Sequence, residues 1–332
     1  MSPYAALKIG DYELPHQVIL APMSGITDKP FRQIVRQAGG GLVVSEMIAS
    51  HAFLQDVWIE MQKLKGAARD EAPLSIQIAG WDPVMMAEAA RLADMRGADL
   101  IDINMGCPAK KVTNRLSGSA LMQDEKAVKA IVSAVVGAVQ VPVTLKMRLG
   151  WDDEHKNAPT IAKIAEGEGI QLLAVHGRTR TQMYKGNADW RRIAETVDAV
   201  SIPVCANGDI LSVADAKTAL EQSGASGLLV GRGAMGKPWL IGQIADMMAC
   251  RAIRKTPDYE EIISIIKNHI HLVTEQHGTR GLRQMRKHLS AYCDALPQSE
   301  TLRAVMMSAS DDAALYDAID NYVADLPVIR AA

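Results

Sequence analysis

PLSIQIAG, at residues 73–80, alternates between two kinds of side chain: positions 74, 76 and 78 carry Leu, Ile and Ile, and positions 75, 77 and 79 carry Ser, Gln and Ala. Successive side chains of a β-strand point to opposite faces, so this strand has one apolar face and one small or polar face. In a barrel surrounded by helices, the apolar face packs on the helices and the other face points into the interior. The stretch therefore predicts one strand of such a barrel.

Strand-like runs rich in Val, Ile and Leu recur along the chain, and Ala-rich segments compatible with helices fill most of the gaps. The runs begin near positions 18, 41, 73, 100, 141, 172, 202 and 227. Eight β/α units over about 230 residues fit a (β/α)8 TIM barrel, whose usual length is about 250 residues. An open doubly wound sheet is the alternative, but its phosphate-binding glycines follow the first strand as G-x-G-x-x-G, which APMSGIT (21–27) does not match. We therefore predict an α/β fold built on a TIM barrel.

The strand pattern stops near residue 245, and the segments after it carry apolar residues at helical spacing. They are YEEIISIIKNHIHLVTEQHG (259–278), RGLRQMRKHLSAYCDAL (280–296) and DAALYDAIDNYVADL (312–326). We therefore expect a barrel over residues 1–245 and a small all-helical domain over residues 246–332. His269 and His271, two residues apart on the first helix, point to different sides and are not expected to bind a metal together.

Composition narrows the class of protein. The 332 residues are 48% hydrophobic, enough for one large core and a smaller attached domain. No stretch approaches the roughly 18 uninterrupted apolar residues of a membrane span, and the first residues lack a charged-then-apolar signal pattern. We therefore expect a cytoplasmic protein with no membrane partner. Because the net charge is only −2, binding to nucleic acid would need a local basic patch.

DINMGCPAKKV (102–112) places a cysteine next to a glycine, directly after a strand. Four roles are open for Cys107: a small buried hydrophobe, a metal ligand, half of a disulfide, or a reactive acid or nucleophile. The other cysteines, Cys205, Cys250 and Cys293, are far away in sequence, and there is no C-x-x-C pair or zinc-finger spacing. The disulfide and zinc interpretations therefore have little support, and we predict no metal site.

Polar residues recur at the inward positions of five consecutive strands, near their C-terminal ends. Isolated polar residues inside a barrel could simply satisfy one another's hydrogen bonds. The C-terminal ends of the strands, however, form the face where barrel active sites lie, so the repeated pattern predicts a shared functional site there. The residues are Gln77, Asp102, Asn104, Thr144, Lys146, Arg148, His176, Arg178, Asn207 and Asp209.

Glycines cluster where the seventh and eighth strands end, in CANGDI (205–210) and LLVGRGAMGKPW (228–239). These loops are the customary phosphate site of a TIM barrel, because backbone N–H groups in such loops can close around an anion. Arg232 adds a charged donor, although the glycines could also serve only tight turns. Lys146, next to Gln77, could contact the polar edge of a flat heteroaromatic ring, or form a Schiff base as in an aldolase.

Eight motifs follow one another along the chain. They are VILAPMSGITDKPFR (18–32), SEM (45–47), LSIQIAG (74–80), DINMGCPAKKVTNRLSGSALM (102–122), VTLKMRLGWD (143–152), VHGRTRTQMYKG (175–186), PVCANGDI (203–210) and GLLVGRGAMGKPWL (227–240). As a set they resemble the flavin-dependent tRNA-dihydrouridine synthases, most closely the bacterial B-type branch. The resemblance runs through all eight strands and into the helical domain, and GCPAKKV followed by GSALM is its most specific part.

The resemblance implies a binding site for FMN, with NADPH as the reductant. Asn104 and Arg178 would hold the target uracil, and Lys110 and Lys111, beside the cysteine, could steer the RNA backbone. The implied FMN contacts agree with the polar barrel mouth and the glycine-rich loops. They are Ala21, Pro22, Met23, Gln77, Lys146, His176, Asn207, Gly208, Asp209, Gly231 and Arg232.

The resemblance also implies a role for Cys107. Reducing the C5=C6 bond of uracil takes a hydride at one carbon and a proton at the other, and a flavin supplies only the hydride. In this family the cysteine of the GCP motif is the proton donor, so Cys107 would protonate C5 while reduced FMN delivers hydride to C6. An unperturbed thiol, with a pKa of about 8.5, is mostly protonated at pH 7, which suits an acid.

HGTRGLRQMRKH (277–288) is a basic run in the helical domain, with no acidic residue between Glu275 and Asp294. Basic runs are often just solvated helix faces, but acidic residues gather near the end of this domain, so its charge is segregated. Together with the helical tRNA-binding domain of the family, this favours a surface that follows RNA phosphates. The predicted tRNA contacts are Arg280, Arg283, Arg286 and Lys287.

The predicted function is the reduction of specific D-loop uridines of tRNA to 5,6-dihydrouridine by an FMN- and NADPH-dependent oxidoreductase. Two alternatives remain open from the sequence. One is a reductase or dehydrogenase of a free pyrimidine, like dihydroorotate dehydrogenase, and the other is a non-catalytic RNA-binding protein on a barrel scaffold. The basic helical domain argues against the first, and the polar barrel mouth with Cys107 argues against the second. The sequence predicts neither the uridine position nor the oligomeric state.

Overall fold

A computed structural model describes residues 6–50, 72–114 and 116–325. Within these residues, eight parallel strands pair in a ring, because β4 pairs with both β3 and β6 and so closes the sheet. This confirms the (β/α)8 barrel. A short strand, β5 (Ile48–Ala49), is added beside β6. The barrel strands are β3 (Val18–Leu20), β4 (Val43–Val44), β6 (Leu74–Ala79), β7 (Leu100–Met105), β8 (Val143–Arg148), β9 (Leu172–His176), β10 (Val204–Asn207) and β11 (Gly227–Val230).

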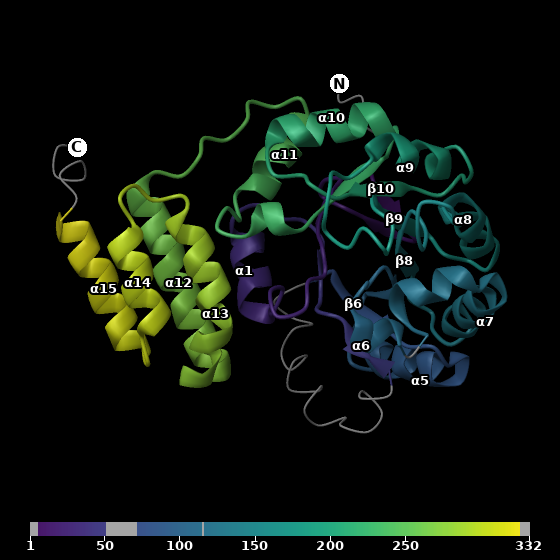
Figure 1. The fold of residues 1–332 in the computed structure, drawn as a ribbon, viewed down its shortest axis with the longest axis horizontal. Helices are drawn as coiled ribbons and strands as arrows, with labels where there is room; N and C mark the ends of the chain where they lie inside the picture. Colours follow the sequence, from purple (N-terminus) through teal and green to yellow (C-terminus); the bar gives the residue numbers. More distant parts are fainter. Residues whose placement is uncertain (1–5, 51–71, 115, 326–332) are drawn as a thin grey trace.

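Helices follow the strands and cover the outside of the barrel (Figure 1). Several begin at a side chain that accepts a hydrogen bond from the first turn, such as Asp28, Asp124 and Ser212. These caps explain why those three helices begin where they do. The helices are α1 (Lys29–Gln37), α5 (Pro83–Asp94), α6 (Lys110–Thr113), α7 (Glu125–Val136), α8 (Ala158–Gly167), α9 (Trp190–Val197), α10 (Val213–Ser223) and α11 (Leu240–Met248), with 3-10 turns η1 (Gly118–Gln123) and η2 (Arg232–Ala234).

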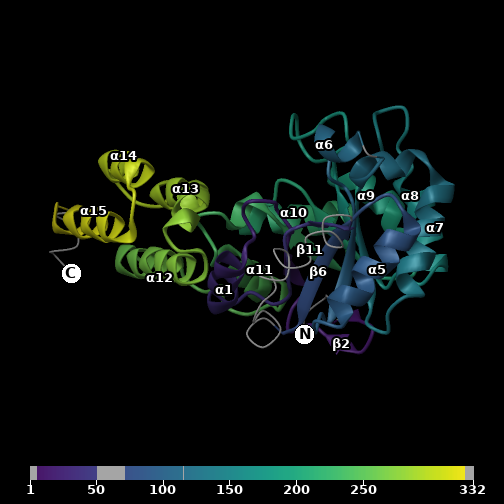
Figure 2. The ribbon, with the colours of Figure 1, turned by 90° about the horizontal axis from the view of Figure 1, so that it is seen from below.

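Side chains alternate along the barrel strands between the outer face and the interior, and each set belongs to its own apolar cluster. Outward residues such as Ile76 and Ile78 pack against the helices, whereas inward residues near the strand starts form a second apolar cluster that includes Leu100 and Cys205. Burial raises the pKa of Cys205 to about 12, so this thiol stays protonated. The hairpin β1 (Lys8–Ile9) and β2 (Tyr12–Glu13), which the strand pattern does not predict, supplies Ile9 to the inner cluster. In Figure 2 the hairpin lies at the opposite end of the barrel from α6.

The C-terminal region is helical, as expected, and lies to one side of the barrel (Figures 1 and 2). Its helices share a core of their own around Ile266, Leu289 and Tyr292. The expected boundary at residue 245 falls inside α11, whose apolar side belongs to the barrel core, and it stays a prediction. Residues 326–332 lie outside the described part. The helices are α12 (Tyr259–His277), α13 (Thr279–Cys293), α14 (Glu300–Ser308) and α15 (Asp312–Asp325).

No helix in the described residues has both the length and the apolar character needed to cross a membrane.

Candidate active site

The C-terminal ends of the barrel strands surround a cavity of about 930 Å³. Every residue expected to contact FMN lines it, and so do Cys107 and Asn104. Arg148, one of the inward polar residues expected at the barrel mouth, also lines the cavity. Several lining residues had no role predicted from the sequence, among them Trp81, Met183 and Tyr184.

Beside the cavity, β6, β7 and β8 carry a line of hydrogen-bonded polar side chains, of which Gln77 and Asn104 reach the lining. Thr144 Oγ1 donates to Asp102 Oδ1 and Gln77 Nε2 donates to Asp102 Oδ2, each at 2.6 Å. Asn104 Nδ2 in turn donates to Gln77 Oε1 at 2.8 Å. Strand register explains the contacts, since Asp102 lies directly between Gln77 and Thr144 on adjacent strands. The inward polar residues therefore do satisfy one another, and they do so at the edge of the cavity.

Cys107 begins the loop after β7, and several groups fix its backbone. Its N–H donates to Asn104 Oδ1 at 2.9 Å, while its carbonyl accepts from the Ser119 N–H at 3.1 Å and Ser119 Oγ at 2.9 Å. Gly118 has φ +60°, and a Cβ there would come within 2.8 Å of Cys107 O. Arg148 Nε donates to Gly106 O at 2.8 Å. The GSALM motif thus supports the GCP motif, which places a half-buried thiol at the cavity.

Two basic side chains at the cavity have altered protonation. Burial and the nearby Arg148 lower the pKa of Lys146 to about 8, so most of this amine is protonated at pH 7. Burial and the surrounding cations, Lys146 foremost, hold the pKa of His176 well below its ordinary value, so the imidazole is neutral. The register places Asn104 beside Lys146. An ammonium next to neutral amides can bind the accepting edge of a flat polar ring.

The other end of the cavity is formed by the loops after β10 and β11. Gly208 has φ +112°, and a Cβ there would lie 2.8 Å from both Ala188 Cβ and His176 Cδ2, so a side chain does not fit. Burial alone would raise the pKa of Asp209, but hydrogen bonds from Arg178 and the Ala188 N–H keep it below its ordinary value. Arg232, half exposed, lies 3.2 Å from Asp209. Glycine backbone and a guanidinium at one end of the cavity can bind an anion.

A family model described as dihydrouridine synthase matches residues 19–325. The chain belongs to the dihydrouridine synthase family. It is 49% identical over 314 residues to a probable tRNA-dihydrouridine synthase of Rickettsia bellii, covering 94% of this chain and 96% of that protein. It is 45% identical over 322 residues to tRNA-dihydrouridine synthase B of Pseudomonas aeruginosa, covering 97% of each. These relatives confirm the resemblance to the B-type branch.

A solved complex of 2-naphthoyl-CoA reductase with 2-naphthoyl-CoA shares the fold, with a TM-score of 0.56 and 14% sequence identity. The match covers 74% of this chain and 52% of that one. At this identity the likeness concerns the barrel architecture alone.

Arg178 was expected to contact the substrate, but in the structure its side chain is buried and hydrogen-bonded within the protein. It is 2% exposed and donates to Asp209 Oδ1 at 2.9 Å and Oδ2 at 2.5 Å. It also donates to the carbonyl oxygens of Lys185, at 3.1 Å, and Gly186, at 2.6 Å. It is absent from the described residues that line the cavity. Contact with a uracil by Arg178 stays a prediction, and it would require these bonds to rearrange.

Tyr184 is an exposed aromatic ring at the cavity mouth, 55% accessible. The guanidinium carbons of Arg148 and Arg232 lie 5.6 and 5.2 Å from its ring centroid, within cation–π range. Arg148 also donates to Thr179 O and Met183 O, at 2.9 Å each, which fixes the loop that carries the tyrosine. An exposed ring held in this way can stack on an unpaired base.

The predicted tRNA contacts lie outside the cavity. Arg280, Arg283 and Lys287 are exposed on α13 and Arg286 is half-buried. Among the described residues, none of these four forms an ion pair. Lys287 Nζ lies 3.3 Å from the position of a Cβ at Gly25, two residues after the cavity residue Met23. Lys287 therefore lies beside the barrel mouth. Lys110 is exposed on α6, followed by Lys111.

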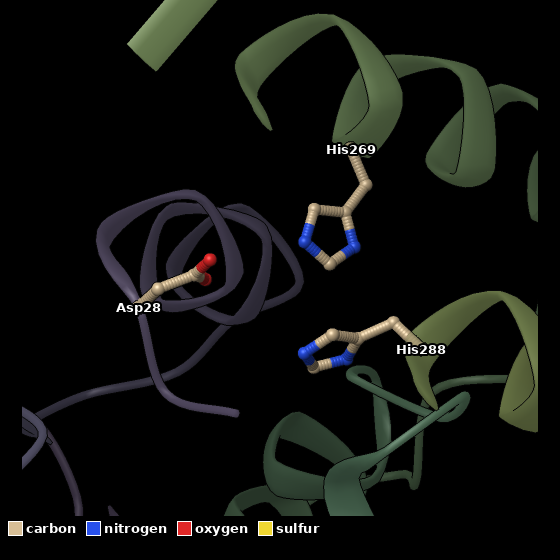
Figure 3. A group of neighbouring side chains, drawn as sticks. All are labelled: Asp28, His269 and His288. Carbon is tan, nitrogen blue, oxygen red and sulfur yellow. The ribbon is translucent and has the colours of Figure 1, made fainter. Parts of the chain in front are cut away.

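His269 on α12 and His288 on α13 lie close to Asp28, which precedes α1 of the barrel (Figure 3). His271 is exposed, in keeping with the expected divergence of the two α12 histidines. One nitrogen or oxygen atom from each member of the trio lies within 4.8 Å of the others, close enough to suggest metal ligands. One nitrogen of each ring has a protein partner: His288 Nε2 lies 3.0 Å from Ile26 O and His269 Nδ1 lies 3.1 Å from the Tyr292 hydroxyl. The other two nitrogens, His288 Nδ1 and His269 Nε2, are buried and have no hydrogen-bond partner among the described residues.

Phe31 lies against the same two imidazoles, with centroid separations of 4.4 Å to His288 and 5.8 Å to His269. The rings thus pack α1 against α12 and α13, and the expectation of no metal site stays an expectation.

Proposed function

We propose that this protein reduces the C5=C6 bond of specific D-loop uridines in tRNA, with FMN as its bound cofactor, NADPH as the reductant and Cys107 as the proton donor. The observation that carries the proposal is the convergence of Cys107, Asn104 and the expected FMN contacts on one cavity, in a chain of the dihydrouridine synthase family. We further propose that it acts in the cytoplasm, where tRNA is its macromolecular partner.

The residues around the cavity fit FMN from one end to the other. Gln77 and the protonated Lys146 offer polar contacts to the edge of a flavin ring, and the neutral His176 lies nearby. The Gly208 loop and Arg232 offer donors to the phosphate. Ala21, Pro22 and Met23 complete the lining. When bound and reduced, FMN supplies the hydride for C6 of the uracil.

Cys107 supplies the other hydrogen. Its thiol transfers a proton to C5, which leaves a thiolate that regains a proton from solvent. Asn104, whose Oδ1 holds the Cys107 N–H, has one Nδ2 hydrogen beyond the bond to Gln77 and can direct it toward a uracil carbonyl. A hydrogen bond therefore joins the loop that carries the thiol to the base-binding amide on β7.

The target base must leave its stack in the folded tRNA to reach the cavity, at a cost of a few kcal/mol. We propose that Tyr184 stacks on a base at the mouth, and that Arg280, Arg283, Arg286 and Lys287 hold the RNA phosphates beside it. The proximity of Lys287 to Gly25 supports a continuous path from α13 to the mouth.

The test is to purify the full-length protein, record its flavin absorbance, and map dihydrouridine on tRNA that lacks it, with NADPH present. We expect flavin bands and newly reduced D-loop uridines. Flavin with reduction of small pyrimidines, and none of tRNA, would favour the free-pyrimidine reductase, and a colourless protein that binds RNA would favour the non-catalytic alternative.

Replacing the proton donor gives the sharper result. We expect Cys107→Ala to keep its FMN and its tRNA affinity but to lose at least about 10²-fold in turnover, the contribution usual for a positioned acid. Cys250→Ala, at an exposed cysteine outside the cavity lining, is the matched control and should behave as the wild type. Wild-type turnover in Cys107→Ala would contradict the assigned acid.

A further inference from the structure

The line of hydrogen bonds inside the barrel has a direction. It begins at Asp102 on β7, crosses to Gln77 on β6, returns to Asn104 on β7 and ends at the backbone N–H groups of Gly106, at 3.2 Å, and Cys107, at 2.9 Å. The three side chains are between 1% and 7% exposed. Such buried polar groups keep the partners that the fold gives them.

Each amide in this line has two ends that are not equivalent. Amide nitrogen only donates and amide oxygen only accepts, whereas an ionised carboxylate only accepts. Asp102 therefore requires Gln77 to present its nitrogen, which turns the Gln77 oxygen toward Asn104. Asn104 must then donate to that oxygen, which turns its own oxygen toward the N–H groups of the cysteine loop.

A reversed Asn104 would place its NH2 group against two backbone N–H donors. The loop would then lose both hydrogen bonds that fix the Cys107 backbone on its amino side. Since a displacement of about 1 Å can cost about 10²-fold in rate, the orientation of two amides away from the reacting carbon matters for proton transfer.

The surroundings of Asp102 suit this task. Each of its oxygens accepts a hydrogen bond, Oδ1 from Thr144 Oγ1 and Oδ2 from Gln77 Nε2. Burial raises its pKa, and these bonds and the charge of Lys146 oppose that rise in part. Ser45 Oγ accepts from the Gln77 N–H at 3.0 Å, which fixes the strand that carries the middle link. The side chain of Asp102 is 5% exposed and does not line the cavity among the described residues.

We infer that Asp102 is a positioning residue: its carboxylate sets the orientation of the Gln77 and Asn104 amides and, through them, the place of the Cys107 thiol. The inference rests on the proposed function only for its activity readout, because the geometry of the loop can be measured without any reaction.

The experiment compares four variants of the full-length protein. Asp102→Leu and Asp102→Ala both remove the group that accepts the hydrogen bond from Gln77. Leu fills the space of the carboxylate and Ala leaves it empty, so if one variant does not fold, the other can still be measured. Asp102→Asn keeps an acceptor for Gln77 and is the conservative rescue. Thr144→Val removes a buried hydrogen bond to the same carboxylate without touching either amide, and it is the matched control.

The first readout is amide hydrogen exchange of the peptide that contains Gly106 and Cys107. We expect exchange at least about 10-fold faster in Asp102→Leu and Asp102→Ala, as befits the loss of about one hydrogen bond's free energy, and near-wild-type exchange in Asp102→Asn and Thr144→Val. Unchanged exchange in both Leu and Ala variants would overturn the inference.

The second readout is tRNA reduction. We expect kcat to fall about 10²-fold in the Leu and Ala variants, with a larger solvent isotope effect, and to stay within a few-fold in Asp102→Asn. If kcat falls as far in Asp102→Asn as in Asp102→Leu, the negative charge of Asp102 is what the reaction needs, rather than the orientation of the two amides. That result would overturn the inference. If the wild type itself does not reduce tRNA, the proposed function fails, and the exchange result alone decides the positioning role.

Discussion

Burial lowers the pKa of Lys146 toward neutral pH, so the charge of this side chain changes within an accessible pH range. Its ammonium form is the one proposed to donate to the edge of a flavin, and its pKa of about 8 comes from burial and the charge of Arg148. FMN affinity of the apo-protein should therefore be highest below pH 8 and fall as the pH rises through that value. Fluorescence titration of FMN between pH 6.5 and pH 9.5 measures this.

Lys146→Gln is the informative variant, because its amide still donates but does not titrate. We expect weaker FMN binding with little pH dependence across the same range. A decline above pH 8 as steep as in the wild type would assign the titration to another group.

Prediction from sequence succeeds where the signal is local to one element. The strands were expected to begin near positions 18, 41, 73, 100, 141, 172, 202 and 227, and they begin at 18, 43, 74, 100, 143, 172, 204 and 227. The period-2 alternation also places Gln77 and Asp102 inside the barrel, and the structure confirms it.

Contacts between elements have no such local signal. Three contacts depend on how segments distant in sequence pack together. They are the close approach of Gly118 to Cys107, the ion pair of Arg178 with Asp209, and the ring contact of His269 with His288. The hairpin β1–β2 escapes prediction because two-residue strands leave no periodicity to detect.

Helix α13 is the element expected to carry the affinity for tRNA. Replacing Arg283, Arg286 and Lys287 by Gln removes three cations that form no ion pair among the described residues. Up to three phosphate contacts should therefore be lost. The slope of log affinity against log salt should fall by about 2 to 3, with FMN content unchanged. Filter binding between 50 and 200 mM salt measures it.

The matched control for this element replaces three exposed lysines on the outer helices α7, α8 and α10 by Gln: Lys126, Lys163 and Lys217. This triple variant changes the net charge of the protein by the same amount, at positions on the outer helices of the barrel. An equal loss of slope in the control would mean that overall charge, not the α13 surface, attracts the RNA.

The whole molecule depends on the junction that holds the helical domain to the barrel. His288 is 2% exposed, packs against Phe31 and faces His269 and Asp28, with Lys287 as its sequence neighbour. Burial lowers its pKa from 6.5 to about 4, despite the bond to Ile26 O. The unfolded chain therefore binds this proton between pH 6.5 and pH 4 while the folded chain does not, so folding stability falls as the pH falls through that window.

Between pH 6.5 and pH 5, above the range in which most carboxylates titrate, the loss from His288 should reach about 2 kcal/mol. His288→Gln, which can still donate to Ile26 O, should reduce the pH dependence by that amount while lowering stability at pH 7 only modestly. Urea unfolding at pH 7, 6 and 5 measures both quantities. Equal pH dependence in the variant and the wild type would mean that His288 is not the neutral, buried link between α1 and α13, and that the domains are joined mainly by the apolar packing around Phe31.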